Sequence, residues 1–532
     1  MKITKLETMH VEPRWLFLQI HTDEGIIGLG EPVVEGRAQT VAAAVQEIGR
    51  YLIGQDPRRI EHHWQAIYRG QFYRGGPVLC SALSGIEQAL WDITGKWLGV
   101  PVYQLLGGAT REKIRMYGWL GGETYGEYIE SAKVSAEQGF TALKTGIGGA
   151  VNWIDTPALV ERVVERFAAI REAVGTTVDV GIDFHGRCTP AMSIRLAQAL
   201  EPYDPFFIEE PVLPENVDAL ATVARSTSIP IATGERLFTK WGFREVLEQQ
   251  AAAILQPDLS HAGGILESKK IAAMGETYYA AVAPHCPLGP IALAACLQLD
   301  ACIPNFLAQE HVTLGEGYLK EPFTIKDGYI DVPTGPGLGI ELDLEALEDK
   351  RFDGSWETPR LWHPDGSVAD WSAHVRGYIN TSIDVVARQE VIDDSRTTEY
   401  PLDLYGSAAL RHDSSSGQRS HPHAEPGSVG SGGGRVYAGV FAEPHLHPEP
   451  GEFPHRALSQ HGARQPERRW DVPGEPGSHH PNPPRRGLRL WAVGQAPSHC
   501  RQWACGGDAG GPIRVPCDPL EPPSATRGLL AH

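Results

Sequence analysis

The sequence predicts an α/β protein: a (β/α)7β barrel of the TIM type with an N-terminal α+β capping domain and a disordered C-terminal extension. Three observations support this prediction. Short apolar runs recur about every 25 residues, helix-like text separates them, and the composition changes abruptly after Trp371. We expect residues 1–110 to form the capping domain and 111–335 the barrel. Residues 336–371 should pack back on the capping domain, and 372–532 should be the extension.

The first 110 residues differ from the repeat that follows them. The segment LFLQIHTDEGIIGLGEP predicts two strands around a turn, and sequence typical of helices extends from about Ala38 to Leu52 and from Ala82 to Trp97. This mixture predicts a separate α+β domain. Between the two helices, the Gly- and aromatic-rich segment 68–78, YRGQFYRGGPV, is interpreted either as a lid over the barrel mouth or as a plain surface loop.

Six apolar runs carry the barrel prediction, and each ends in an acidic residue or a histidine. They are TVDVGID (Asp183), PFFIEE (Glu209), IPIATGE (Glu235), AAAILQPD (Asp258), YYAAVAPH (His285) and NFLAQE (Glu310), preceded by IRMYGWLGG and FTALKTG. The runs are too short for helices and too continuously apolar for half-exposed strands, so they predict buried parallel strands. Strands alternating with helices at this period indicate a barrel, whose active site lies at the carboxyl ends of its strands. Six such residues in six repeats disfavour the alternative that each merely caps the next helix.

Three of these residues predict a metal site. Asp183, Glu209 and Glu235 stand 26 residues apart, so they should end three adjacent strands. Three carboxylates at one barrel mouth repel each other unless a cation lies among them. Hard oxygen ligands with room for water and substrate favour Mg²⁺, one ion per site, over zinc. Glu210, next to Glu209, is assigned instead to a salt bridge.

Two histidines complete a site for acid–base chemistry. His185 lies two residues after Asp183 and, as residue i+2 of the same strand, should share its face and point into the same mouth, while His285 arrives from the opposite side of the ring. One supplies a candidate acid and the other a candidate base. Asp258 should hydrogen-bond His285 and fix its tautomer, and Glu310 should bind the substrate or a developing oxyanion.

Two basic residues remain open to more than one interpretation. Lys144 ends FTALKTG near the mouth of an earlier strand, and Arg187 follows His185 by two positions. Each is a candidate for neutralising an acidic substrate, and for Lys144 a plain salt bridge is an equal alternative.

A metal ion together with a histidine base is suited to removing the proton next to a substrate carboxylate, with the metal stabilising the enediolate that forms. A protonated second histidine could then expel a hydroxyl as water, which is the dehydration of a hydroxy acid.

The motifs resemble the enolase superfamily and, within it, closely resemble the galactonate dehydratase family. The matching text is LFLQIHTDEGIIGLGEPVVEGRA, YLIGQDP, QFYRGGPV, GIDFHGR, FFIEEPVL, ATGERLF, ILQPDLSHAGGI, APHCPLGPIALAAC and WHPDGSVADW, and the resemblance covers about residues 1–371. It implies conversion of D-galactonate to 2-dehydro-3-deoxy-D-galactonate and water with Mg²⁺.

Carried over by position, the family's functional residues match this chain without a gap. The resemblance implies that Asp183, Glu209 and Glu235 bind the metal, His185 protonates the departing C3 hydroxyl, and His285 is the C2 base, with Asp258 tuning His285 and Glu310 stabilising the transition state. Other interpretations stay open: a dehydratase of another aldonate such as gluconate, a sugar-acid epimerase, or an inactive sugar-acid-binding protein.

Composition narrows the class of partner. The net charge of −19 disfavours nucleic acid, and no window approaches the ~18 consecutive apolar residues of a membrane span. The eight cysteines show no CxxC pattern, and the N-terminus has no secretory signal, so we expect reduced thiols and a cytoplasmic protein. The expected partner is a small sugar acid, and the resemblance suggests a homo-oligomer.

Residues 372–532 have a different composition from the rest. They contain no lysine, against 12 in residues 1–371, and hold 19 of the 41 prolines and 20 of the 59 glycines. Such text lacks strand or helix periodicity, so residues 400–532 are predicted to be disordered. We interpret the segment as a frameshifted or read-through extension and assign it no function.

Overall fold

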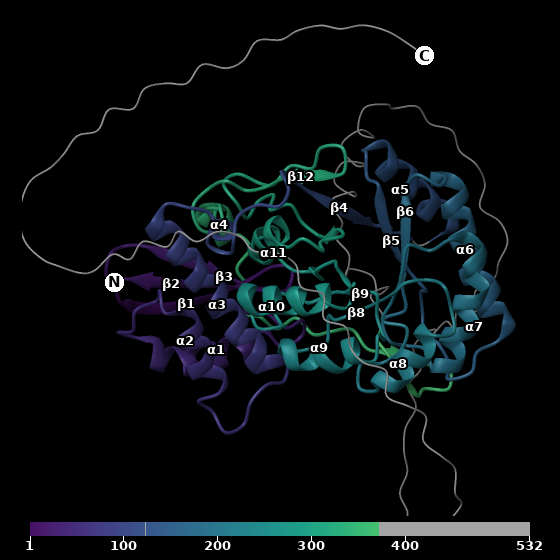
Figure 1. Cartoon of the computed structure of the whole chain (residues 1–532), viewed down its shortest axis with the longest axis horizontal. Coiled ribbons are helices and arrows are strands. Elements are labelled where there is room, and N and C mark those ends of the chain that lie inside the picture. Colours follow the sequence, from purple (N-terminus) through teal and green to yellow (C-terminus); the bar gives the residue numbers. More distant parts are fainter. Residues whose placement is uncertain (123, 372–532) are drawn as a thin grey trace, which may run out of the picture. The chain divides into compact units, whose positions relative to one another are not determined.

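A computed structural model describes residues 1–122 and 124–371; the predicted extension lies outside the described residues. The N-terminal part is a three-stranded antiparallel sheet in the order β1–β2–β3, packed against helices (Figure 1). Its elements are β1 (Ile3–Val11), β2 (Trp15–Thr22), β3 (Ile27–Gly30), α1 (Ala38–Leu52), α2 (Ile60–Tyr68), α3 (Pro77–Leu98) and α4 (Val102–Leu105). The predicted α+β capping domain is confirmed; β1, α2 and α4 were not predicted, and α3 begins at Pro77 rather than near Ala82.

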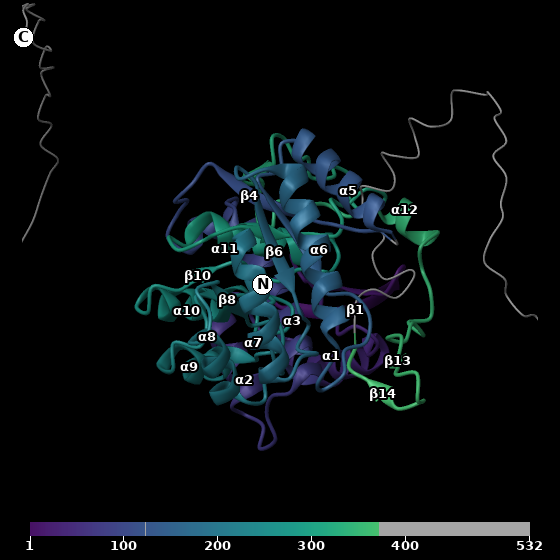
Figure 2. The same cartoon turned by 90° about the vertical axis from the view of Figure 1, so that its right-hand side faces the viewer.

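Eight parallel strands and seven helices follow, which confirms the predicted (β/α)7β barrel (Figures 1 and 2). The strands are β4 (Lys113–Trp119), β5 (Ala142–Gly146), β6 (Asp179–Asp183), β7 (Ile208–Glu209), β8 (Ile231–Thr233), β9 (Ile254–Leu255), β10 (Ala281–Val282) and β11 (Gln309–Glu310). Each pairs with the next from β4 to β10, and β11 pairs with β4. The ring closes where Val282 of β10 bridges Phe306, just before β11.

The barrel helices begin at recognisable start signals. They are α5 (Tyr125–Glu137), α6 (Pro157–Val174), α7 (Pro190–Leu200), α8 (Val217–Ala224), α9 (Thr239–Glu248), α10 (Ile265–Glu276) and α11 (Pro290–Cys302), with a short 3₁₀ turn at Glu201–Tyr203. Proline opens α6, α7 and α11, where its missing N–H costs no hydrogen bond. Thr124 and Glu127 form a capping box on α5. All thirteen residues of α11 are buried, as expected for a helix that is apolar all round.

Two buried carboxylates of the capping domain fasten it to the barrel. Glu31 accepts the N–H groups of Gly289 and Ala292 at the start of α11, at 2.6 and 2.9 Å. Glu87 of α3 accepts those of Ile265 and Leu266 at the start of α10, at 2.7 and 2.9 Å. Because helix N-termini carry free N–H donors and positive partial charge, these contacts stabilise the interface between the capping domain and the barrel.

The chain after the barrel returns to the capping domain. It contains β12 (Tyr329–Asp331), which pairs with β4, then α12 (Leu344–Glu348) and the hairpin of β13 (Leu361–Trp362) and β14 (Val368–Ala369). Leu338 N–H donates to Asp92 of α3 at 2.8 Å, and Val102 N–H donates to the carbonyl of Gly337 at 3.0 Å. No helix in residues 1–122 and 124–371 is long and apolar enough to cross a membrane.

Candidate active site

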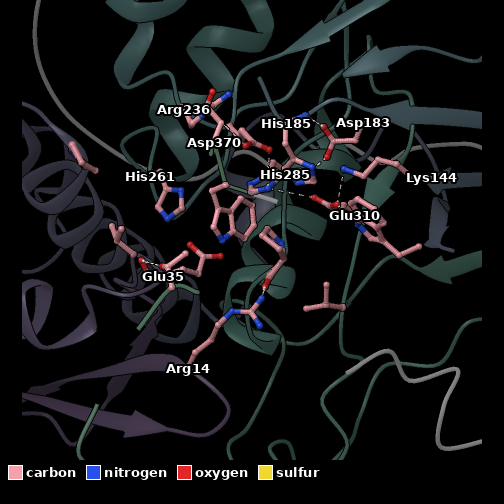
Figure 3. A pocket seen from close by; sticks show the side chains of 18 of the residues that line it. Arg14, Glu35, Lys144, Asp183, His185, Arg236, His261, His285, Glu310 and Asp370 are labelled. Carbon is pink, nitrogen blue, oxygen red and sulfur yellow. Dashed lines mark hydrogen bonds and ion pairs between the residues drawn. The ribbon is translucent and has the colours of Figure 1, made fainter. Parts of the chain in front are cut away.

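A cavity of about 380 Å³ lies at the carboxyl ends of the barrel strands (Figure 3). It brings together most of the predicted site residues. Its lining includes Asp183, His185, Glu235, His285 and Glu310, together with Lys144. Glu209 and Asp258 are buried and do not line the cavity, but they contact lining residues: Glu209 contacts Lys144, and Asp258 contacts His285.

The three predicted metal ligands come from neighbouring strands. Asp183 and Glu209 are the last residues of β6 and β7 and stand opposite each other in the parallel ladder. Glu235 follows the end of β8 by two residues. Asp183 and Glu209 are essentially inaccessible, and the Glu235 side chain is 13 % exposed. The strand order therefore places three acidic groups around one end of the cavity.

A buried lysine neutralises part of this acidic group. Lys144 of β5 places its Nζ 2.7 and 2.9 Å from the two carboxylate oxygens of Glu209, and 2.8 Å from Oε1 of Glu310. Burial alone would lower the pKa of Lys144, but these two carboxylates raise it well above its ordinary value. The plain salt bridge, one of the two alternatives for Lys144, is present, and the side chain also reaches the cavity.

The acidic groups perturb one another strongly. Burial raises the pKa of Glu209 well above its ordinary value; Lys144 opposes this rise, and the charges of Asp183, Glu310 and Glu235 add to it. Burial, with neighbouring carboxylates, also raises the pKa of Glu235. For Asp183 burial acts in the same direction, but His185 and Lys144 outweigh it and lower the pKa. A further cation among these groups would favour their ionised forms.

The donor set fits a hard divalent cation in its chemistry. Asp183 Oδ2 accepts no hydrogen bond within the described residues, although it lies 3.0 Å from Nε2 of His185. As the side chains stand, no three His, Cys, Asp or Glu residues in residues 1–122 and 124–371 are grouped as ligands of one ion. The ammonium of Lys144 contacts both oxygens of Glu209. To bind a metal, this carboxylate would either have to lose one of these contacts or hold the metal and the ammonium together.

His285 is held by a carboxylate, as predicted from its spacing to Asp258. Asp258 and His285 form a parallel bridge, and Nδ1 of the imidazole lies 2.8 Å from Oδ2 of Asp258. Nε2 faces the cavity, 3.2 Å from Glu235 and 3.9 Å from Glu310. Burial would lower the pKa of His285, but these three carboxylates raise it well above its ordinary value. Geometry and charge both suit a proton acceptor.

His185 reaches the cavity by a different route from the one predicted. The strand β6 ends at Asp183, so His185 does not share its face as residue i+2 of a strand. It lies instead in a turn with φ of 50°, and its N–H donates to Oδ1 of Asp183 at 2.7 Å. The ring lies near Trp119 and Trp371, with centroid distances of 6.2 and 5.3 Å.

Glu310 is fixed by three donors. Its Oε1 accepts the indole N–H of Trp119 at 2.6 Å and contacts Lys144, and its Oε2 accepts the N–H of Cys286 at 2.9 Å. Burial would raise the pKa of Glu310, but Lys144 and His285 lower it to about 2. The side chain is therefore an ionised, rigid acceptor at the cavity wall.

The remaining predicted residues lie outside the cavity. Glu210 forms the expected salt bridge, with Nε of Arg236 donating to Oε2 at 3.0 Å. Arg187, the candidate for substrate binding, is buried and donates to the carbonyls of Phe184, Gly148 and Gly149. It is absent from the residues lining the cavity, so the structure gives it a structural role.

Several lining residues have no signal in the repeat. Arg14, Val34 and Glu35 come from capping-domain loops, and His261 follows β9, with Nε2 2.8 Å from the carbonyl oxygen of Val33. Trp119 ends β4, and the strand-end rule could have identified it. In segment 68–78, Pro77 lines the cavity, whereas Phe72 and Tyr73 are 90 % and 84 % exposed and do not, so the segment reaches the site only at the end that begins α3.

Known proteins resemble the chain in both sequence and fold. Residues 3–107 match the mandelate racemase / muconate lactonizing enzyme N-terminal domain, and residues 127–347 match the enolase C-terminal domain-like family. The D-galactonate dehydratase of Ralstonia nicotianae is 52% identical over 383 residues, which is 70% of this chain and 100% of that protein. That of Pectobacterium atrosepticum is 51% identical over 382 residues, with the same coverage.

Solved structures agree with this relationship. The mandelate racemase/muconate lactonizing enzyme-like protein from Roseovarius sp. TM1035 is 36% identical, with a TM-score of 0.65 over 70% of this chain and 100% of that one. The mandelate racemase/muconate lactonizing enzyme from Sulfitobacter sp. is 37% identical, with a TM-score of 0.63 over 66% and 95%.

Proposed function

Because the chain belongs to the D-galactonate dehydratase family of the enolase superfamily, we propose that it dehydrates D-galactonate to 2-dehydro-3-deoxy-D-galactonate and water in a Mg²⁺-dependent reaction. The observation that carries the proposal is the cavity itself. It presents His285, hydrogen-bonded to Asp258, and His185 beside the carboxylates of Asp183 and Glu235, with Glu209 buried next to Asp183. Such a set can remove a proton next to a carboxylate and protonate a leaving hydroxyl.

Asp183, Glu209 and Glu235 are the residues that would hold Mg²⁺. Their oxygen donors, the burial of Asp183 and Glu209, and the raised pKa values of Glu209 and Glu235 support this assignment. Bound there, the ion would supply positive charge near the carboxylate of the sugar acid, which makes the proton on the adjacent C2 carbon more acidic.

His285 acts as the base at C2 in this proposal. Its Nδ1 is held by Asp258, so in the neutral imidazole Nδ1 carries the proton and Nε2 presents its lone pair to the cavity. The carboxylate of Asp258 also stabilises the imidazolium that forms when Nε2 takes the C2 proton. Glu310 is fixed close to Nε2 and would orient substrate hydroxyls by accepting their hydrogen bonds.

His185 acts as the acid at C3. In its protonated form the imidazole gives a proton to the departing hydroxyl, which leaves as water while the electrons left at C2 form the C2–C3 double bond. The resulting enol then tautomerises: C3 takes up a proton and the C2 hydroxyl loses one, which gives the 2-keto-3-deoxy product. Trp119, Val312 and Leu213 supply apolar lining that limits access of water to these steps.

The proposal extends to location and assembly. We propose a cytoplasmic enzyme, supported by the free thiols of all five cysteines in the described residues. We also propose a homo-oligomer, supported by large exposed side chains such as Phe72, Tyr73 and Trp153. Light scattering coupled to size-exclusion chromatography tests the assembly; a single species of 58 kDa would contradict it.

A substrate comparison tests the proposed reaction. The full chain is incubated with D-galactonate or D-gluconate, with Mg²⁺ or EDTA, and the 2-keto-3-deoxy product is quantified. We expect turnover of D-galactonate with Mg²⁺ and none with EDTA. Faster turnover of D-gluconate would show that another aldonate is the substrate. Formation of an epimer without a keto acid would show that the enzyme is an epimerase. Binding without any product would leave an inactive sugar-acid-binding protein. His21→Asn, on β2 and outside the cavity, serves as the control for His185→Asn and His285→Asn.

A further inference from the structure

The last two residues described by the structure belong to the cavity. The hairpin of β13 and β14, paired at Leu361–Ala369 and Trp362–Val368, delivers Asp370 and Trp371 into the lining. Figure 3 labels Asp370 at the cavity, near Arg236. Ala369, just before them, is buried, which anchors the hairpin beside the cavity.

Trp371 makes a specific contact with His185. The two rings meet edge to face, with centroids 5.3 Å apart and planes at 84°. Trp119 lies 6.2 Å from the same imidazole, at an angle of 21°. Both distances fall in the range of favourable aromatic pairs.

These aromatic contacts matter because His185 has few polar restraints. His285 is fixed through Nδ1 by Asp258, which has no other role in the proposed reaction. By contrast, Nδ1 of His185 is buried and makes no hydrogen bond within the described part of the chain. Its Nε2 contacts Asp183, a carboxylate assigned to the metal. The aromatic rings are thus the contacts left to orient the imidazole independently of the metal site.

We propose that Trp371 is a positioning residue that holds the His185 imidazole in place for proton transfer. The catalytic consequence rests on the proposed function, because only a dehydratase needs an acid at C3. Losing the orientation of a general acid removes much of its hundredfold or greater contribution, so we expect Trp371→Ala to lower dehydration ten- to a hundredfold. His285 has its own anchor in Asp258 and should keep its rate of C2 proton exchange.

Kinetics in D₂O test this assignment with three variants of the full chain. Trp371→Ala should lose dehydration while C2 deuterium exchange stays within twofold of the wild type. Trp371→Phe, which keeps a ring, should retain most of the dehydration rate. Trp362→Ala is the matched control, since Trp362 stands in the same hairpin outside the cavity. A proportional fall in exchange and dehydration, or no fall in either, would overturn the positioning role.

A second readout needs no substrate. In protein labelled at histidine ¹³Cε1, the His185 signal is assigned by its disappearance in His185→Asn. Removing the ring at position 371 should shift this signal, because a ring edge-on at this distance changes its local magnetic field, while Trp362→Ala should leave it in place. An unmoved His185 signal in Trp371→Ala overturns the contact. A moved signal in an enzyme that does not dehydrate D-galactonate supports the contact and refutes the proposed function instead.

Discussion

Replacing Lys144 by methionine probes the charge balance of the site directly. Lys144 is 1 % exposed and contacts three carboxylate oxygens of Glu209 and Glu310 within 2.9 Å. Methionine keeps the apolar stem and removes the ammonium. Glu310 keeps the N–H donors of Trp119 and Cys286, whereas Glu209 keeps the side-chain amide of Gln256, at 2.6 Å, as its side-chain donor within the described residues. The uncompensated charge therefore falls mainly on Glu209.

The expected loss follows from the burial of these groups. Removing one partner of a buried ion pair costs about 3–5 kcal/mol, so Lys144→Met should lower the free energy of unfolding in EDTA by about that amount. Mg²⁺ at a hundred times its Kd stabilises the wild type by about 2.7 kcal/mol. The variant should bind Mg²⁺ at least tenfold more tightly, because no ammonium competes for Glu209. The difference between the two proteins should then shrink by at least about 1.4 kcal/mol when Mg²⁺ replaces EDTA.

Equilibrium urea unfolding followed by tryptophan fluorescence measures both quantities. Lys240→Met is the matched control, because Lys240 on α9 lies 2.8 Å from the buried Glu267 and away from the cavity lining. That variant should be destabilised equally with EDTA and with Mg²⁺. If Lys144→Met is as stable as the wild type in EDTA, or if Mg²⁺ stabilises both proteins equally, the reasoning about Lys144 and the metal site is refuted.

Two further substitutions test the base and the junction between the domains. Asp258→Asn removes a charge that raises the pKa of His285, and the base works in its neutral form. When kcat/KM is measured between pH 5 and 9, the pH at which it rises to half its maximum should therefore be lower in the variant, and kcat should fall about a hundredfold. An unchanged midpoint would contradict the assignment of His285 as the base. Glu87→Ala leaves two N–H groups of α10 and the Trp91 indole without their acceptor, which should cost about 3–5 kcal/mol of unfolding free energy in urea. A loss below about 1 kcal/mol would show that the junction does not depend on this carboxylate.

The sequence was informative where chemistry coincides with the end of a buried strand. Asp183 and Glu209 end apolar runs, and parallel pairing brings the carboxyl ends of neighbouring strands together, so their proximity follows from the repeat. The same periodicity predicted the barrel and the pairing of Asp258 with His285. These features need only local pattern and the rules of parallel sheets.

Other features depend on contacts between distant segments or on backbone details. His261 approaches the carbonyl of Val33, and Trp371 reaches His185, through packing that no period encodes. The turn that carries His185 has a positive φ, which alternation along a strand cannot anticipate. The contact of Lys144 with Glu209 and Glu310 depends on side-chain direction inside a closed barrel, so the sequence left its two alternatives equal. Pro77 did signal the true start of α3, through the preference of proline for the first helical turn.

One measurement tests the central proposal most directly: a proton NMR time course of the full chain with D-galactonate and Mg²⁺ in D₂O, repeated with His185→Asn and His285→Asn. We expect the wild type to form the 3-deoxy-2-keto acid. The His185 variant should exchange the C2 proton without eliminating water, and the His285 variant should do neither. If the wild type forms no keto acid, or if the His285 variant still exchanges C2, the assigned reaction or the assigned base is wrong.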